Sequence, residues 1–107
     1  MGSKNKIIAP ALPKRFQILG NEWKIEYCDN LYTQHGAWGM TDFNQNLVQI
    51  QRPNGTVSTP QDHVMSTLCH EIFHVILHSM SYHDANKDED FVDRVGASAW
   101  QILKTIK

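Results

Sequence analysis

The sequence has little of several features that would place it in a specialised class of protein. It has only two cysteines, Cys28 and Cys69, too few for the disulfide framework of a small secreted domain. No run reaches the roughly 18 apolar residues that a membrane-spanning helix needs. The ten basic residues are scattered among eleven acidic ones, for a net charge of −1, and form no cluster suited to a phosphate backbone. We therefore expect neither a membrane protein nor a nucleic-acid-binding protein.

Length and composition predict one small globular domain that follows an N-terminal tail. The chain has 107 residues, of which 41% are hydrophobic and 20% charged, so a modest core can form and intrinsic disorder is not expected. We assign residues 1–14, with Pro10 and Pro13, to a flexible tail and residues 15–107 to the domain. The tail has no apolar segment like that of a signal peptide. We therefore expect a cytoplasmic protein whose cysteines are free thiols.

The first half of the chain is patterned like a small β-sheet. Short apolar or alternating stretches at 16–19 and 23–27 flank Gly20-Asn21, a sequence typical of a tight hairpin turn. Residues 36–41 and 47–51 predict a second pair of extended segments. The residues between the two pairs fit either a loop or a short helical turn. We expect an antiparallel or mixed sheet.

The second half is patterned like two helices. Thr59 is a candidate N-cap and Pro60 suits the first helical position, so a helix is predicted from there to about Met80. The polar stretch 81–87 is predicted to be a connection. Residues 88–107 carry apolar side chains at helical spacing and predict a second helix. The fold class predicted from these elements is α+β, with the small sheet packed on the two helices.

The most specific pattern lies in the first of these helices. His70, Glu71 and His74 form an HExxH motif inside an apolar run. At 3.6 residues per turn, the two histidines lie on one helical face and can bind one metal ion. Glu71 is rotated by about 100° from His70, so it can reach a water molecule as a general base, as in zinc hydrolases. The alternative is a helix whose histidines only make hydrogen bonds in the core.

A catalytic zinc site usually has three protein ligands, so the motif requires one more donor. Glu89 is the leading candidate, because fifteen residues after His74 the last helix can return antiparallel across the first. Asp93 lies one turn further on the same face. His83 and Asp84 stay open as alternatives, although the chain would have to turn back tightly to bring them to the metal.

Four other features bear on the surroundings of this site. His78 continues the face of the motif histidines, but it lies about 12 Å along the helix from His70, so we expect it beside the site or exposed. His78, Tyr82 and His83 are the candidates for stabilising an oxyanion. Trp38 is a candidate to line the cleft. Gly96, in the last helix, would let the two helices approach closely.

Three segments carry a family resemblance: WGMTDFNQNLVQIQ from Trp38, HEIFHVILH from His70 and EDFVDRV from Glu89. Together they resemble small phage and prophage metallopeptidases related to the ImmA/IrrE-like zincins and, more distantly, SprT-like proteins. The resemblance covers residues 16–105 and implies a minimal zincin-like domain in which His70, His74 and Glu89 hold zinc. It departs from ImmA-like proteins after Glu89, where those proteins have an Ala-Asn pair.

The function that we expect from these patterns is that of a Zn2+-dependent endopeptidase with Glu71 as the general base. Its partner would be a protein or peptide substrate, and the resemblance suggests a host or phage regulator. The alternative is a non-catalytic zinc-binding domain that engages a partner protein, and a metal-free interaction domain is a third reading. The sequence indicates neither the identity of the substrate nor the oligomeric state.

Overall fold

The computed structural model describes residues 9–54 and 60–107. Residues 1–8 of the predicted tail and the predicted N-cap Thr59 lie outside the described residues. The fold is α+β, as predicted, and consists of a four-stranded sheet and four helices along the described chain. The elements follow one another as β1 (Arg15–Ile18), β2 (Asn21–Cys28), α1 (Leu31–His35), β3 (Gly39–Asp42), β4 (Leu47–Gln51), α2 (Gln61–Ser79), α3 (His83–Lys87) and α4 (Glu89–Thr105).

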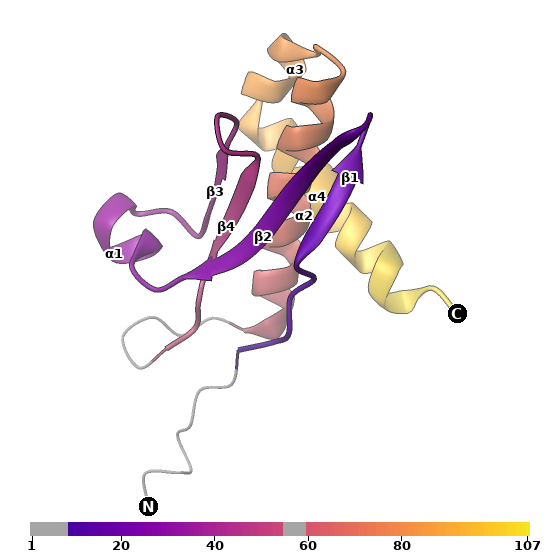
Figure 1. The fold of residues 1–107 in the computed structure, drawn as a ribbon. Helices are drawn as coiled ribbons and strands as arrows, with labels where there is room; N and C mark the ends of the chain where they lie inside the picture. Colours follow the sequence, from indigo (N-terminus) through magenta and orange to yellow (C-terminus); the bar gives the residue numbers. More distant parts are fainter. Residues whose placement is uncertain (1–8, 55–59) are drawn as a thin grey trace, which may run out of the picture.

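The sheet is mixed and has the strand order β1-β2-β4-β3, so that β1 and β3 are its edges (Figure 1). β1 and β2 are antiparallel, as are β3 and β4, whereas β2 and β4 are parallel. The hairpin between β1 and β2 turns at Leu19 and Gly20, whose φ angles of 48° and 83° are those of a two-residue turn. The turn is one residue earlier than predicted because Asn21 pairs with Ile18.

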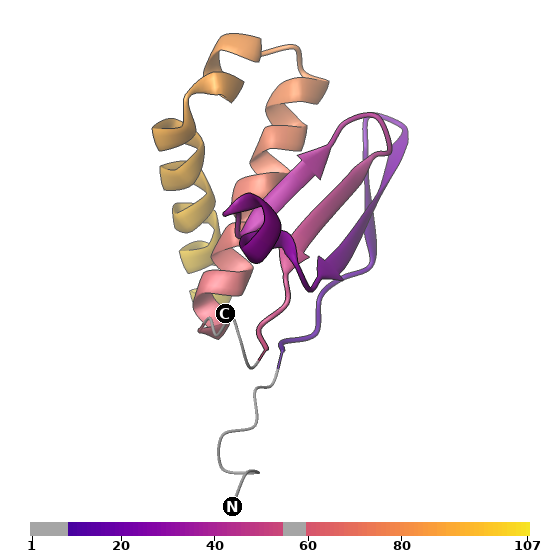
Figure 2. The ribbon, with the colours of Figure 1, turned by 90° about the vertical axis from the view of Figure 1, so that its left-hand side faces the viewer.

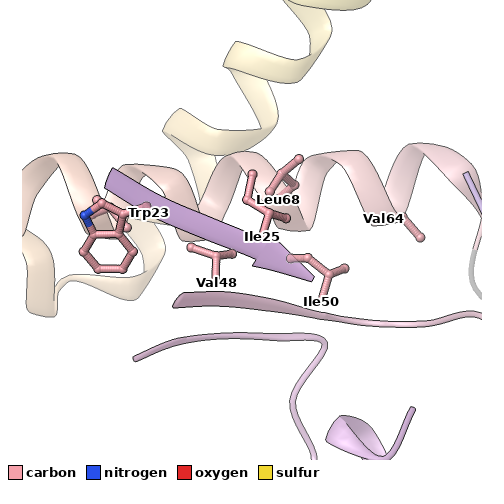
Figure 3. Packing of buried hydrophobic residues seen from close by; sticks show 7 residues of the cluster. Trp23, Ile25, Val48, Ile50, Val64 and Leu68 are labelled. Carbon is pink, nitrogen blue, oxygen red and sulfur yellow. The ribbon is translucent and has the colours of Figure 1, made fainter. Parts of the chain in front are cut away.

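Helix α2 forms the centre of the molecule and lies between the sheet and α4 (Figure 2). Its sheet-facing side packs on alternate residues of β2 and β4, and Figure 3 shows these side chains between the strands and the helix. This alternation is what places one face of each strand in the core. The buried cluster consists of Trp23, Ile25, Val48, Ile50, Val64, Leu68 and Val75.

Two short helices complete the fold. The segment between the two strand pairs, for which the sequence allowed either a loop or a helical turn, contains helix α1. The buried side chain of Gln51 holds this helix in place. Its Oε1 accepts a hydrogen bond from Tyr32 N at 2.7 Å, and its Nε2 donates one to Asp29 O at 2.9 Å. The stretch 81–87, predicted to be a connection, contains helix α3, so that prediction was wrong. The segment has no apolar periodicity that would predict a helix. Backbone hydrogen bonds nevertheless form within it, such as that from Asn86 N to Tyr82 O at 3.0 Å.

The described part of the N-terminal segment lies against the sheet. Tyr27 donates a hydrogen bond to Pro10 O, and Ile25 N donates to Lys14 O at 2.9 Å. Cys28 and Cys69 are both free thiols, as predicted, and burial raises the pKa of Cys69. Among residues 9–54 and 60–107, no helix combines the length and apolar character needed to cross a membrane.

Candidate metal centre

Three side chains from two helices converge beside the middle of α2. His70 and His74 project from adjacent turns of α2, and Glu89 is the first residue of α4. The Nε2 atoms of the two histidines are 3.2 Å apart. Oε1 of Glu89 lies 3.0 Å from Nε2 of His74 and 3.3 Å from Nε2 of His70. This cluster could hold a metal ion.

The other ring nitrogen of each histidine faces an oxygen atom. Nδ1 of His74 lies 2.6 Å from Oδ1 of Asn86, in α3. An amide oxygen only accepts hydrogen bonds, so His74 Nδ1 is the donor. Nδ1 of His70 lies 3.5 Å from a carboxylate oxygen of Asp93. The Asn86 oxygen fixes the ring of His74 and leaves its Nε2 lone pair free for a metal. The Asp93 carboxylate favours the same tautomer of His70.

The chemistry of the cluster favours a bound cation. In the tautomers with the proton on Nδ1, which the Asn86 oxygen imposes on His74 and the Asp93 carboxylate favours for His70, two nitrogen lone pairs and a carboxylate oxygen face one another at 3.0–3.3 Å. Three acceptors at this separation repel one another unless a positive charge lies between them. The carboxylates of Glu71 and Asp93, near His70, add further negative charge. The donor set is therefore one that could hold a cation.

The structure distinguishes among the candidates for the third ligand. Among the residues that it describes, His70, His74 and Glu89 are the one group of three or more potential ligands whose donor atoms lie close together. Asp93 faces Nδ1 of His70, away from the nitrogen that faces Glu89. His83 and Asp84 form the first turn of helix α3, and the ring of His83 contacts that of His78. Neither residue belongs to the group of potential metal ligands.

The candidates for an oxyanion stabiliser lie away from the cluster. The ring of His78 packs on Phe43 with centroids 4.1 Å apart, and His83 contacts the other side of His78 at 5.9 Å. Tyr82 is 57% exposed. Within the described chain, none of His78, Tyr82 and His83 lines the pocket next to the candidate metal ligands.

Close packing of α4 on α2 brings Glu89 to the histidines. Gly96 is buried, and a Cβ built on it would lie 2.8 Å from both the backbone N and the Cα of His70. The backbones of α4 and α2 thus approach each other closely at His70, the first histidine of the motif. This close approach was predicted from Gly96. At the far end of the pair, Asp62 of α2 accepts hydrogen bonds from Trp100 at 3.2 Å and Lys104 at 2.9 Å.

Glu71 lies beside the cluster but points to the sheet side. Only 7% of the residue is exposed. Its Oε1 accepts a hydrogen bond from Thr41 Oγ1 at 2.7 Å, and its Oε2 lies 3.9 Å from Nε2 of His70. Burial raises the pKa of the Glu71 carboxyl above its ordinary value, and the Thr41 hydrogen bond and the two histidines oppose that rise.

A pocket of about 320 Å³ opens beside these residues. His63, His70 and Glu71 of α2 line it, together with residues 36–39 before and at the start of β3 and with acidic side chains of α4. Trp38, predicted as a possible lining residue, is part of this wall and stacks on Tyr32 with ring centroids 4.2 Å apart. The pocket is large enough for part of an extended peptide.

Comparison of the chain with protein-family models, with curated proteins and with solved structures finds no match. The functional reading of this site therefore depends on side-chain chemistry and geometry.

Reasoning from the sequence did not find Asn86 or Thr41. Asn86 lies 12 residues from His74, in a helix that the apolar pattern does not predict. Thr41 lies 30 residues from Glu71, so only the packing of the sheet on α2 brings the two together. A polar residue facing inward on a strand of the sheet that packs on the motif helix is the feature that could have drawn attention to Thr41.

Asn86 gives a first testable prediction. Replacing Asn86 by alanine removes the oxygen that orients His74, and we expect metal affinity to fall by roughly 10–100-fold, as for other partners of metal-binding histidines. Asn86→Asp keeps an acceptor at that position and is the matched control. Both variants are titrated with zinc against a competing chelator. An unchanged affinity in Asn86→Ala would contradict the orienting role.

Proposed function

We propose that the protein is a zinc-dependent endopeptidase in which His70, His74 and Glu89 hold the metal. The observation that carries the proposal is the convergence of two Nε2 atoms and one carboxylate oxygen at 3.0–3.3 Å. Ligand atoms of a tetrahedral zinc site, with bonds of about 2.0–2.1 Å, lie about 3.4 Å apart. Two imidazoles and a carboxylate are also a usual zinc ligand set in peptidases, whereas magnesium and calcium prefer oxygen ligands alone.

The position of Glu71 favours a catalytic zinc site over a non-catalytic one. Zinc held by these ligands would polarise a peptide carbonyl and make a nearby water molecule more acidic. Glu71 accepts the proton of the attacking water at Oε2, the oxygen nearer to His70, and then delivers it to the departing amine. The buried position of this carboxylate, which raises its pKa, suits a group that must both take up and release a proton.

The sheet edge offers a place for the substrate backbone. β3 pairs with β4 on one side, and within residues 9–54 and 60–107 no strand pairs with its other edge. An extended peptide can add to such an edge through main-chain hydrogen bonds. Gly39, at the start of β3, and Trp38, just before it, line the pocket beside His70 and Glu71. A peptide laid along β3 would therefore pass close to the metal ligands, which favours cleavage within a chain.

The proposal is tested with the purified wild-type chain, zinc and a mixed peptide library. We expect about one zinc per chain and internal cleavage of peptides detected by mass spectrometry, with loss of cleavage on chelation and recovery on addition of zinc. Stoichiometric zinc without cleavage of any peptide would contradict the peptidase and favour a non-catalytic zinc domain that engages a partner protein. Absence of zinc binding would contradict both.

The non-catalytic reading has one observation in its favour. The ligands come from two helices, so a bound metal would tie α2 to the start of α4 and add to the stability of a small core. The buried carboxylate of Glu71 is not needed for that purpose, because it is not part of the ligand group. This is why the catalytic reading is preferred.

A further inference from the structure

Strand β3 holds the general base directly. Thr41, in β3, donates the hydrogen bond from its hydroxyl to Oε1 of Glu71 at 2.7 Å. Glu71 is almost completely buried, and a buried carboxylate oxygen without a partner is costly. The hydroxyl of Thr41 is therefore the group that satisfies this oxygen within the interface between β3 and α2.

The same strand also restricts the space around Glu71. Gly39 and Thr41 are two residues apart and so lie on the same face of β3. A Cβ added to Gly39 would lie 2.9 Å from Cγ of Glu71 and 3.2 Å from its Oε2. The side chain of Glu71 is thus confined by Gly39 and anchored by Thr41, which leaves little freedom for the carboxylate to rotate.

This arrangement gives the two oxygens of the Glu71 carboxylate different surroundings. Oε1 is occupied by the Thr41 hydroxyl, and Oε2 lies on the side of His70, 3.9 Å from its Nε2. A carboxylate that rotated freely would present either oxygen, or neither, toward the metal ligands. Holding a catalytic group within a narrow range of orientations is a major source of rate enhancement.

We propose that Thr41 is a positioning residue that holds Oε1 of Glu71 so that Oε2 faces the reacting water. This inference rests on the proposed peptidase function and deepens it. It makes the edge strand that would receive the substrate backbone also the element that orients the base. Thr41 itself contacts no reacting atom, and it acts only through Glu71.

The test compares Thr41→Val, which removes the hydroxyl, with Thr41→Ser, which keeps it. We expect kcat to fall by roughly 10–100-fold in Thr41→Val, as for loss of a hydrogen bond to a charged group, with KM and zinc content unchanged. Thr41→Ser should recover kcat to within a few-fold of the wild type. Thr33→Val is the matched control, because it removes a hydroxyl whose bond to Asn30 O at 3.3 Å lies on the exposed surface of α1.

The outcomes separate this inference from the function on which it rests. Equal kcat in the wild type and Thr41→Val, or failure of Thr41→Ser to restore kcat, would overturn the role of Thr41 but leave the peptidase in place. Absence of cleavage by the wild type would overturn both. If Thr41→Val does not fold, as judged by its melting transition, Thr41→Ala replaces it and the comparison with Thr41→Ser is unchanged.

Discussion

Replacing Glu71 by glutamine is expected to lower kcat for peptide cleavage by about 10²–10⁴-fold, the usual contribution of a general base. Glutamine has nearly the same shape, and its amide oxygen can still accept the hydrogen bond from Thr41. It cannot accept the proton of a water molecule. Because Glu71 is not one of the three clustered ligands, we expect the variant to keep its zinc.

The measurement is kcat and zinc content for the wild type, Glu71→Gln and a control. Glu26→Gln, in an exposed position of β2, makes the same chemical change away from the site and should leave both quantities unchanged. Full activity in Glu71→Gln would rule out the role of general base. Loss of zinc from Glu71→Gln would instead indicate that Glu71 is needed to form the metal site.

Substituting alanine for Gly96 is expected to destabilise the fold and to disrupt the metal centre. In an exposed helix this change would stabilise the protein by about 1 kcal/mol, because alanine favours the helical backbone. Here the new Cβ would lie 2.8 Å from backbone atoms of His70, which cannot rotate away as a side chain can. Overpacking of this kind costs about 1–3 kcal/mol, so the steric cost exceeds the gain.

The metal should be affected by Gly96→Ala because α4 carries Glu89. If α4 moves away from α2, the carboxylate leaves both histidines, and zinc affinity should fall by more than the roughly 10–100-fold expected for loss of an orienting partner. Ser98→Ala introduces the same side chain at an exposed position of α4 and serves as the control. Chemical denaturation and zinc titration measure the two effects, and an unchanged affinity would argue against helix proximity as the source of the third ligand.

Local patterns in the sequence predicted the helices that carry the site. The apolar period around His70 and His74 indicated α2, whose observed bounds are Gln61–Ser79. Pro60, predicted at the first helical position, is instead the N-cap of this helix and makes no side-chain cap hydrogen bond. The small residue at Gly96 indicated close helix packing, which the contact with His70 confirms. These features depend on residues within a few turns of one another, so they can be predicted without knowing the tertiary structure.

Features that depend on how elements are oriented could not be predicted in this way. Glu89 and Asp93 lie one turn apart on the same face of α4, and both were possible ligands. Only the crossing of α4 over α2 places Glu89 near Nε2 of both histidines and Asp93 near Nδ1 of His70. The same reason explains why the parallel pairing of β2 with β4 and the contact of Thr41 with Glu71 emerged only from the structure.

The placement of Thr41 also separates the origin of the candidate ligands from that of the proposed base. The three clustered side chains and Asn86 all fall within residues 70–89, so the candidate ligands and the residue that orients His74 come from one continuous stretch of the chain. Contacts between residues close in sequence cost less loop-closure entropy than contacts between distant segments. The contact of Thr41 with Glu71 spans 30 residues and requires the sheet to be packed on α2. Under the proposed function, the ligands would thus come from one local stretch of the chain, whereas the orientation of the base would depend on the whole fold.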